Sequence, residues 1–361
     1  MKSMYSLSEL ASVLEHQAQT KADFLVPVPQ VHMNDDATVD IGADNLHATP
    51  ATDTGHRQLA SYVDIPNAYY DRLRTADPVL LAQNVNRWLS DPSKKDDRRL
   101  VRTLDGKFRA MLSDRYQRID NDVVAEVALN VLHKQKGLRV VSSAVTENRL
   151  YIKAVTSSLV MPVPGSKRGV GDLVEAGVLI QNSETGQGSV SIKPFANFLI
   201  CTNGMVRDSV LRAAHIGRKI DTSIEGLLSD STKRMEDEVV LRKVRDVIEH
   251  AFDRVAFEKF ITNLGVTTKQ RMEGDVNAGI EALGPTLGLQ LGERQSVLRH
   301  LIEGGDLSRY GLANAITRTA EDIDSYDRAT EVETIGYRLI QLPEREWASI
   351  SNAKPLVERV S

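Results

Sequence analysis

The sequence predicts an α+β protein: an antiparallel sheet with a basic hairpin, packed helices, a long helix and a helical C-terminal region. Three observations lead to this fold class. Asp105-Gly106 is a two-residue hairpin signal, because both positions of a type I′ turn need positive φ. Four apolar segments between residues 138 and 200 have strand character and are separated by turn sequences. Apolar residues at helical spacing precede and follow this block.

A chain of 361 residues suggests two or three structural units at about 150 residues each. We divide it into four segments. These are an N-terminal irregular arm with a short helix and an edge strand (1–55), a small helical segment (56–97), a central α+β core (98–220) and a helical C-terminal region (221–361).

The elements before the hairpin are expected to be short. Leu7, Leu10 and Leu14 have helical spacing and predict a helix over 6–17. Residues 24–31 resemble a strand, but Pro27 and Pro29 restrict it to a sheet edge. Two or three short helices are predicted over 59–89, followed by a polar turn over 91–97.

After the hairpin we expect a helix over 122–135 and strands over 138–145, 149–155, 173–181 and 189–200. A glycine-rich loop covers 162–172, and a turn over 183–188 joins the last two strands. A helix is then predicted after Thr202 or Asn203, either of which could serve as its N-cap.

One long helix is predicted over about 224–264. Within it, apolar residues at alternating spacings of three and four form a coiled-coil-like seam: Leu241, Val244, Ile248, Ala251 and Val255. The seam either packs within the subunit or forms a homo-oligomer. The region after residue 267 is expected to be helical, with glycine and proline interruptions.

The composition limits where the protein acts. Cys201 is the one cysteine, which excludes an intramolecular disulfide and favours a reducing compartment. No segment approaches the ~18 consecutive apolar residues of a membrane helix. We therefore expect a cytoplasmic protein that does not enter a membrane.

The hairpin region carries an excess of positive charge. Residues 98–118 hold seven cations and two anions, a net +5, whereas the whole chain has a net charge of −4. Continuing the pairing outward from the Asp105-Gly106 turn sets Arg102 opposite Arg109 on an exposed face. Like charges directly opposite each other are destabilising. We therefore expect either carboxylates from a neighbouring strand or a bound polyanion between them.

The polyanion alternative defines a candidate nucleic-acid site. Cations would contact phosphates and an aromatic ring could stack on a base. The candidate residues are Arg98, Arg102, Lys107, Arg109, Arg115, Tyr116, Arg118, Lys167 and Arg168. The last two lie in the glycine-rich loop, which lacks the Gly-Lys-Ser/Thr ending of a nucleotide-binding P-loop.

The sequence contains no recognisable enzyme active site. The eight histidines are scattered and lack the spacing of a helical metal pair. Asp120 and Asp122 could bind magnesium, but they also suit a helix N-terminus. Asp322, Asp324 and Asp327 could do the same or form a solvated helix face. Cys201 fits a small buried thiol. We expect no catalytic residues, no metal and no cofactor.

Several segments resemble the phage- and plasmid-like proteins grouped as domain-of-unknown-function family 932. The matching segments are SDRYQRIDN (113–121), GVLIQNSETGQGSVSIKPF (177–195), CTNGMV (201–206) and YGLANAITRTAEDIDSYDRATEVETIG (310–336). The resemblance covers roughly residues 55–342 and implies a phage or mobile-element setting in the cytoplasm of a bacterial host cell. The order of hairpin, helix, four strands and helix is also similar to the core of phage single-strand annealing proteins.

Three hypotheses follow. The first is a protein that binds single-stranded DNA through the hairpin and promotes annealing in recombination. The second is a structural or interaction protein of a mobile element, with the basic hairpin as a protein contact. The third, and the least favoured, is a metal-dependent enzyme.

Overall fold

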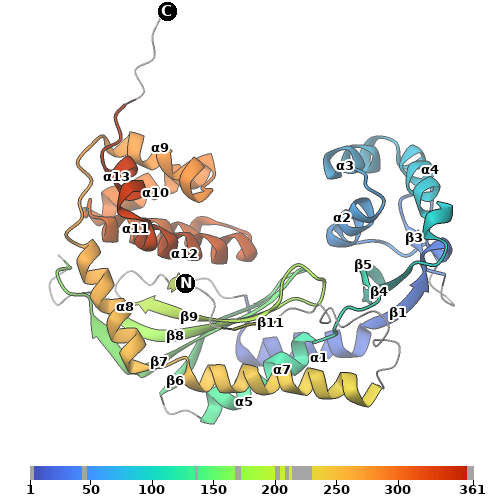
Figure 1. The fold of residues 1–361 in the computed structure, drawn as a ribbon, viewed down its shortest axis with the longest axis horizontal. Coiled ribbons are helices and arrows are strands. Elements are labelled where there is room, and N and C mark those ends of the chain that lie inside the picture. The colour runs from blue at the N-terminus through green and yellow to red at the C-terminus, as the bar shows by residue number, and fades with distance from the viewer. Residues whose placement is uncertain are drawn as a thin grey trace, which may run out of the picture.

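The computed structural model describes residues 4–42, 47–134, 137–166, 172–199, 204–207, 211–213 and 230–355. These residues form an α+β fold with antiparallel sheets, as the sequence predicts. A six-stranded sheet lies at the centre, a three-stranded sheet lies at one end of the long axis, and helices pack around both (Figure 1).

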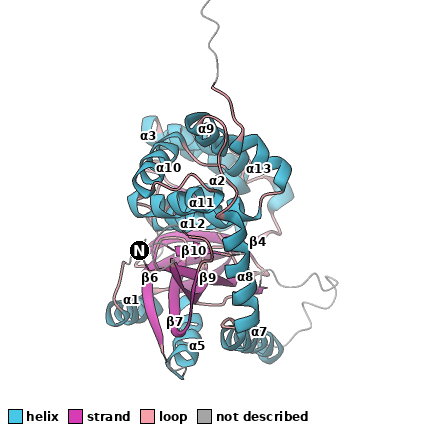
Figure 2. Cartoon of the chain, turned by 90° about the vertical axis from the view of Figure 1, so that its left-hand side faces the viewer, coloured by secondary structure: helices cyan, strands magenta, loops and turns pink. Residues whose placement is uncertain are grey.

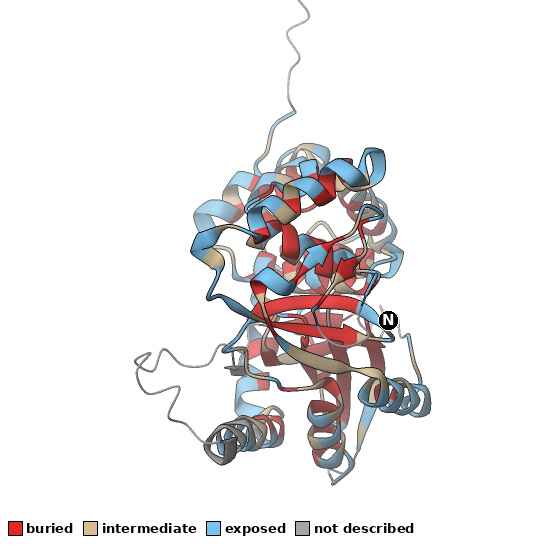
Figure 3. Cartoon of the chain, turned by 90° about the vertical axis from the view of Figure 1, so that its right-hand side faces the viewer, coloured by how far each residue is buried: buried red, intermediate tan, exposed pale blue. Residues whose placement is uncertain are grey.

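The central sheet is built from successive hairpins. Its strands are β6 (Leu138–Val145), β7 (Leu150–Pro162), β8 (Leu173–Asn182), β9 (Val190–Phe198), β10 (Gly204–Val206) and β11 (Leu211–Ala213). The order is β10-β9-β8-β7-β6, and β11 also pairs with β9. The four predicted strands between 138 and 200 are therefore present. β7 and β8 are buried along most of their length, since helices cover both faces of the sheet (Figure 3).

One face of the central sheet packs on three helices, and the other packs on the C-terminal helices (Figure 2). The first layer contains α1 (Leu7–Thr20), α5 (Asn121–Lys134) and α7 (Asp230–His250). The second region contains α8 (Arg254–Thr267), α9 (Val276–Leu287), α10 (Leu291–Gly304), α11 (Arg309–Thr319), α12 (Tyr326–Gln341) and α13 (Glu344–Ser351). Alternate β7 residues explain this layering: Ile152 faces the first layer, whereas Tyr151 packs against Tyr326 of α12.

A buried ion pair joins α12 to the central sheet. The Lys153 ammonium of β7 donates to both carboxylate oxygens of Glu333 in α12, at 2.8 and 2.5 Å. The two residues are 2 % and 4 % exposed. Each charge therefore depends on the other for compensation, because water cannot reach them.

The N-terminal part forms a second sheet with its own helical layer. Its strands are β1 (Ala22–Pro27), β4 (Arg98–Leu104) and β5 (Lys107–Ser113), in the order β1-β4-β5. One face packs on α2 (Asp53–Tyr62), α3 (Asn67–Ala76) and α4 (Pro78–Leu89) around a core that includes Leu59, Val85 and Phe108. A short ribbon of β2 (His32–Met33) and β3 (Val39–Asp40) completes this part.

Several local predictions are confirmed. The helix predicted over 6–17 is present as α1, and Ser6 caps it with a capping box: its hydroxyl accepts from the backbone N–H of Glu9, and the Glu9 carboxylate accepts from the Ser6 N–H. β1 is an edge strand that ends at Pro27, and it pairs with β4 alone. The predicted arm therefore contributes a strand to the hairpin sheet; the four segment boundaries remain predictions.

Two predictions between residues 200 and 264 are wrong. Residues 204–206 form strand β10 beside β9, not the start of a helix; the suggested N-caps Thr202 and Asn203 lie outside the described residues. The long helix is two helices, because the Asp253 side chain caps the N-terminus of α8 by accepting from Ala256 N–H at 2.6 Å.

The break also divides the predicted seam. Val244 and Ile248 are fully buried in the layer beneath the sheet, so this part packs within the subunit. Val255 lies in α8 and is 74 % exposed. Homo-oligomerisation through the seam stays a prediction. Within the described ranges, no helix is long and apolar enough to cross a membrane.

Candidate nucleic-acid interface and the charge network beneath it

The hairpin turn has the predicted conformation, but the strands have a different register. Asp105 and Gly106 have φ of 50° and 67°, as a type I′ turn requires. Leu104 pairs with Lys107 and Thr103 with Phe108. A β-bulge then inserts one extra residue in β5, so Arg102 pairs with Ala110. The predicted pairing of Arg102 with Arg109 is wrong.

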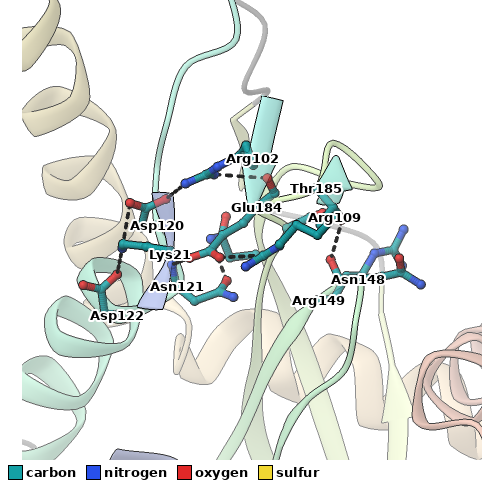
Figure 4. A network of polar contacts seen from close by, with 12 residues as sticks. Lys21, Arg102, Arg109, Asp120, Asn121, Asp122, Asn148, Arg149, Glu184 and Thr185 are labelled. Carbon is teal, nitrogen blue, oxygen red and sulfur yellow. Dashed lines mark hydrogen bonds and ion pairs between the residues drawn. The ribbon is translucent and has the colours of Figure 1, made fainter. Parts of the chain in front are cut away.

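The predicted exposed basic face is also wrong for these two arginines, which are 2 % and 6 % exposed. Bulges commonly redirect a side chain, and this one places Arg109 where it reaches the turn between β8 and β9. Both guanidinium groups point into the space between the hairpin sheet and that turn (Figure 4). The carboxylate alternative stated above is therefore the one that the structure contains.

Arg102 is neutralised by two aspartates. Its Nε donates to Asp23 at 2.8 Å, and its Nη2 donates to Asp120 at 2.6 Å. Its Nη1 donates to the backbone carbonyl of Glu184 at 3.1 Å. Burial alone would lower the pKa of Arg102, but the carboxylates of Asp120 and Asp23 raise it overall. Asp23 belongs to β1 and lies directly across from Arg102 in the strand pairing.

Arg109 is neutralised by Glu184, which is 2 % exposed. Arg109 Nη2 donates to Glu184 Oε2 at 2.7 Å, while Glu184 Oε1 accepts from the backbone N–H of Asn121 at 2.6 Å. Asn121 is the first residue of α5, so this carboxylate also satisfies an N–H at the positive end of the helix dipole. One buried side chain thus joins the hairpin, the β8–β9 turn and α5.

A third cation completes the network. Lys21 Nζ lies 2.8 Å from Asp120 Oδ2 and 3.0 Å from Asp122 Oδ1 (Figure 4). Burial raises the pKa of Asp120, but Arg102 and Lys21 lower it below the ordinary value overall. Asp120, Asp122 and Glu184 are the group of potential metal ligands found within the described part of the chain. Each of the three contacts a cationic side chain, so their negative charge is already compensated.

The other carboxylate cluster is also engaged in internal contacts. Asp322 Oδ2 accepts from Arg299 at 2.6 Å and lies 2.8 Å from His300 Nε2. Asp327 accepts from the Tyr151 hydroxyl at 2.6 Å, which helps to hold α12 on the sheet. Cys201 lies outside the described residues.

Four of the predicted site residues remain on the surface: Arg98, Lys107, Arg115 and Arg118. Arg98 begins β4, and Arg115 and Arg118 follow β5. The Arg118 side chain is 58 % exposed, and its nearest carboxylate, that of Asp23, is 3.7 Å away. The structure thus separates the predicted cations into two buried and four exposed ones. Lys167 and Arg168 lie outside the described residues.

Tyr116 is not available as an exposed stacking ring. It packs against the small cluster of Leu100, Ala110 and Leu112, and its hydroxyl donates to the Ser183 carbonyl at 2.9 Å. Burial raises the pKa of the Tyr116 hydroxyl. Its role is to close the contact between the hairpin and the β8–β9 turn.

The carboxylate partners of the two buried arginines were not predicted from the sequence. Asp23 could have been found from strand alternation, which places Asp23 and Leu25 on the same face of β1. Asp23 lies directly opposite Arg102 on the neighbouring strand β4. Glu184 gave no such signal, since it lies in a turn 75 residues from Arg109. A turn residue in a polar sequence suggests solvent exposure, yet Glu184 is buried.

Comparison of the chain with protein-family models, with curated proteins and with solved structures found no match in any of the three.

Proposed function

We propose that this protein binds single-stranded nucleic acid through exposed cations around its hairpin, in a phage or other mobile element. The observation that supports the proposal is the separation of charges. Arg102 and Arg109 are buried against carboxylates, whereas the side chains of Arg98, Lys107, Arg115 and Arg118 are exposed around the same two strands.

The exposed cations are distributed along the hairpin. Arg99 pairs with Ser113, so Arg98 and the segment that contains Arg115 begin at the same end of the strands. Lys107 lies at the turn at the other end. A polyanion that follows the hairpin would meet positive charge at both ends, while the buried network keeps the two strands in place.

The contact of Arg118 with Asp23 is compatible with phosphate binding. At 3.7 Å and with 58 % of the arginine exposed, this pair is screened by water and contributes little stability. A phosphate group can therefore replace the carboxylate at low energetic cost. Each such contact adds modest affinity, and the sum depends steeply on salt because counterions are released from the nucleic acid.

The test is fluorescence anisotropy with labelled single-stranded and double-stranded DNA at ~50 and ~200 mM salt. The variant Arg98→Glu/Arg118→Glu reverses two exposed charges of the proposed interface. The matched control Arg242→Glu/Arg254→Glu makes the same change in net charge on α7 and α8, where both side chains are well exposed. The proposal predicts salt-sensitive binding that the first variant loses and the control keeps.

Two results would reject the proposal: no binding at ~50 mM salt, or equal loss of binding in both variants. Salt-sensitive self-association without DNA would instead favour an interaction protein of a mobile element. Strand annealing, which the resemblance implies, becomes the next assay if single strands bind more tightly than duplexes.

A further inference from the structure

The exposed aromatic rings of the described residues belong to two neighbouring helices. Tyr69 and Trp88 are 47 % and 48 % exposed, whereas every other described phenylalanine, tyrosine and tryptophan side chain is buried or half-buried. Tyr69 lies in α3 and Trp88 in α4, two helices that pack on each other. This helical pair therefore presents planar aromatic surface that the core does not use.

Trp88 lies at the edge of the buried face of α4. That face is formed by Leu81, Val85 and Leu89, each at most 1 % exposed. Packing thus fixes the helix, while the Trp88 indole is left about half in water. The rigid support matters, because a platform that is already ordered loses little conformational entropy on binding.

Exposed arginines lie close in the sequence to both aromatic residues. Arg87 precedes Trp88 and is exposed, and Arg72 follows Tyr69 by one helical turn and is also exposed. Residues 90–97 connect α4 directly to Arg98, the first residue of β4. α4 and the start of β4 lie at the same end of the long axis (Figure 1). The helix that carries Trp88 therefore leads through this connection to the start of the proposed cationic surface.

We infer that α3 and α4 form a base-stacking surface, on which unpaired bases stack on Trp88 and Tyr69. This inference rests on the proposed function. It assigns recognition of the bases to the aromatic rings, whereas the cations recognise the phosphates. A purely cationic surface would bind single strands and duplexes alike. Stacking needs a free base face, which a duplex hides, so this surface gives a preference for single strands without a preference for sequence.

Tryptophan fluorescence gives a direct test, because the chain has two tryptophans in opposite environments. Trp347 is 3 % exposed and is covered by the guanidinium of Arg309, 5.3 Å from the ring centroid. Ligand-induced quenching therefore reports on Trp88. We expect oligo(dT) to quench emission strongly, and an abasic oligomer of equal length to bind without comparable quenching. Trp88→Phe should remove the quenching.

Affinity gives the second measurement, by anisotropy at ~50 mM salt. Trp88→Ala should weaken oligo(dT) binding about tenfold and leave abasic binding unchanged. The matched control is Leu80→Ala, an apolar residue of α4 that is 39 % exposed. It should bind as wild type does. Circular dichroism would verify that both variants are folded.

The outcomes separate the two claims. Tight oligo(dT) binding that Trp88→Ala leaves intact, or equal quenching by the abasic oligomer, would overturn the stacking surface and leave the cationic interface standing. Weaker oligo(dT) binding by Trp88→Ala, with abasic binding retained, supports stacking. Failure of wild type to bind any single strand would overturn both.

Discussion

Replacing Arg109 by methionine tests whether the buried ion pair of Arg109 with Glu184 stabilises the protein. Methionine keeps a long unbranched side chain but removes the charge that faces Glu184. The two side chains are 7 % and 2 % exposed, and their closest nitrogen and oxygen atoms are 2.7 Å apart. The variant therefore leaves a buried carboxylate with the Asn121 N–H as its remaining donor.

The expected loss is large. Removing one partner of a buried ion pair typically destabilises a protein by about 3–5 kcal/mol, because the other charge is left uncompensated. A domain of ordinary stability has about 5–15 kcal/mol in total. Arg109→Met should therefore shift the midpoint of urea unfolding markedly, as followed by circular dichroism.

Two further variants make the interpretation specific. Arg118→Met removes an exposed arginine of the same region and should change the free energy of unfolding by less than about 1 kcal/mol. Arg109→Met/Glu184→Gln removes both charges, keeps an acceptor for Asn121 N–H and should recover much of the loss. The reasoning is refuted if Arg109→Met and Arg118→Met unfold at the same urea concentration.

Two other stability predictions follow from buried titratable groups. Burial lowers the pKa of His56, which lies 3.0 Å from the Tyr70 hydroxyl, from about 6.5 to about 4. The unfolded chain then binds a proton more readily than the folded protein does. The contribution of neutral His56 to the free energy of unfolding is therefore complete above pH 6.5 and falls by about 3 kcal/mol as the pH decreases to 4. His56→Gln should flatten the stability profile over that interval in urea titrations, and an unchanged slope would contradict the assignment. Separately, Lys153→Met should destabilise the protein by about 3–5 kcal/mol, whereas Lys153→Met/Glu333→Leu should be close to neutral. A double variant as unstable as the single one would show that the ion pair does more than compensate its own charges.

Much of the fold is local in origin and could be predicted. The type I′ turn at Asp105-Gly106 follows from two residues that tolerate positive φ, and the Ser6 cap follows from a Ser-x-x-Glu sequence. The strands between 138 and 200 are recognised by their apolar residues and turns. Each of these signals lies within a few residues of the element that it specifies.

The candidate site depends on long-range contacts, which explains where prediction failed. The prediction continued a regular register from the turn and so paired Arg102 with Arg109. No residue pattern in the hairpin indicates the bulge. With the bulge, Arg109 reaches the distant Glu184, which accepts hydrogen bonds from both arginines. The break between α7 and α8 is a different case, because the Asp253 cap is a local signal in a sequence whose apolar spacing continues past it.

The most direct test of the account is the slope of log affinity against log salt concentration for single-stranded DNA. It would be measured for wild type and for Arg98→Gln/Arg118→Gln. If both arginines neutralise phosphates, the slope should decrease by about 1.4, which is 0.7 for each lost contact, while the free energy of unfolding stays the same. An unchanged slope would show that these exposed cations do not contact nucleic acid and would contradict the proposed interface.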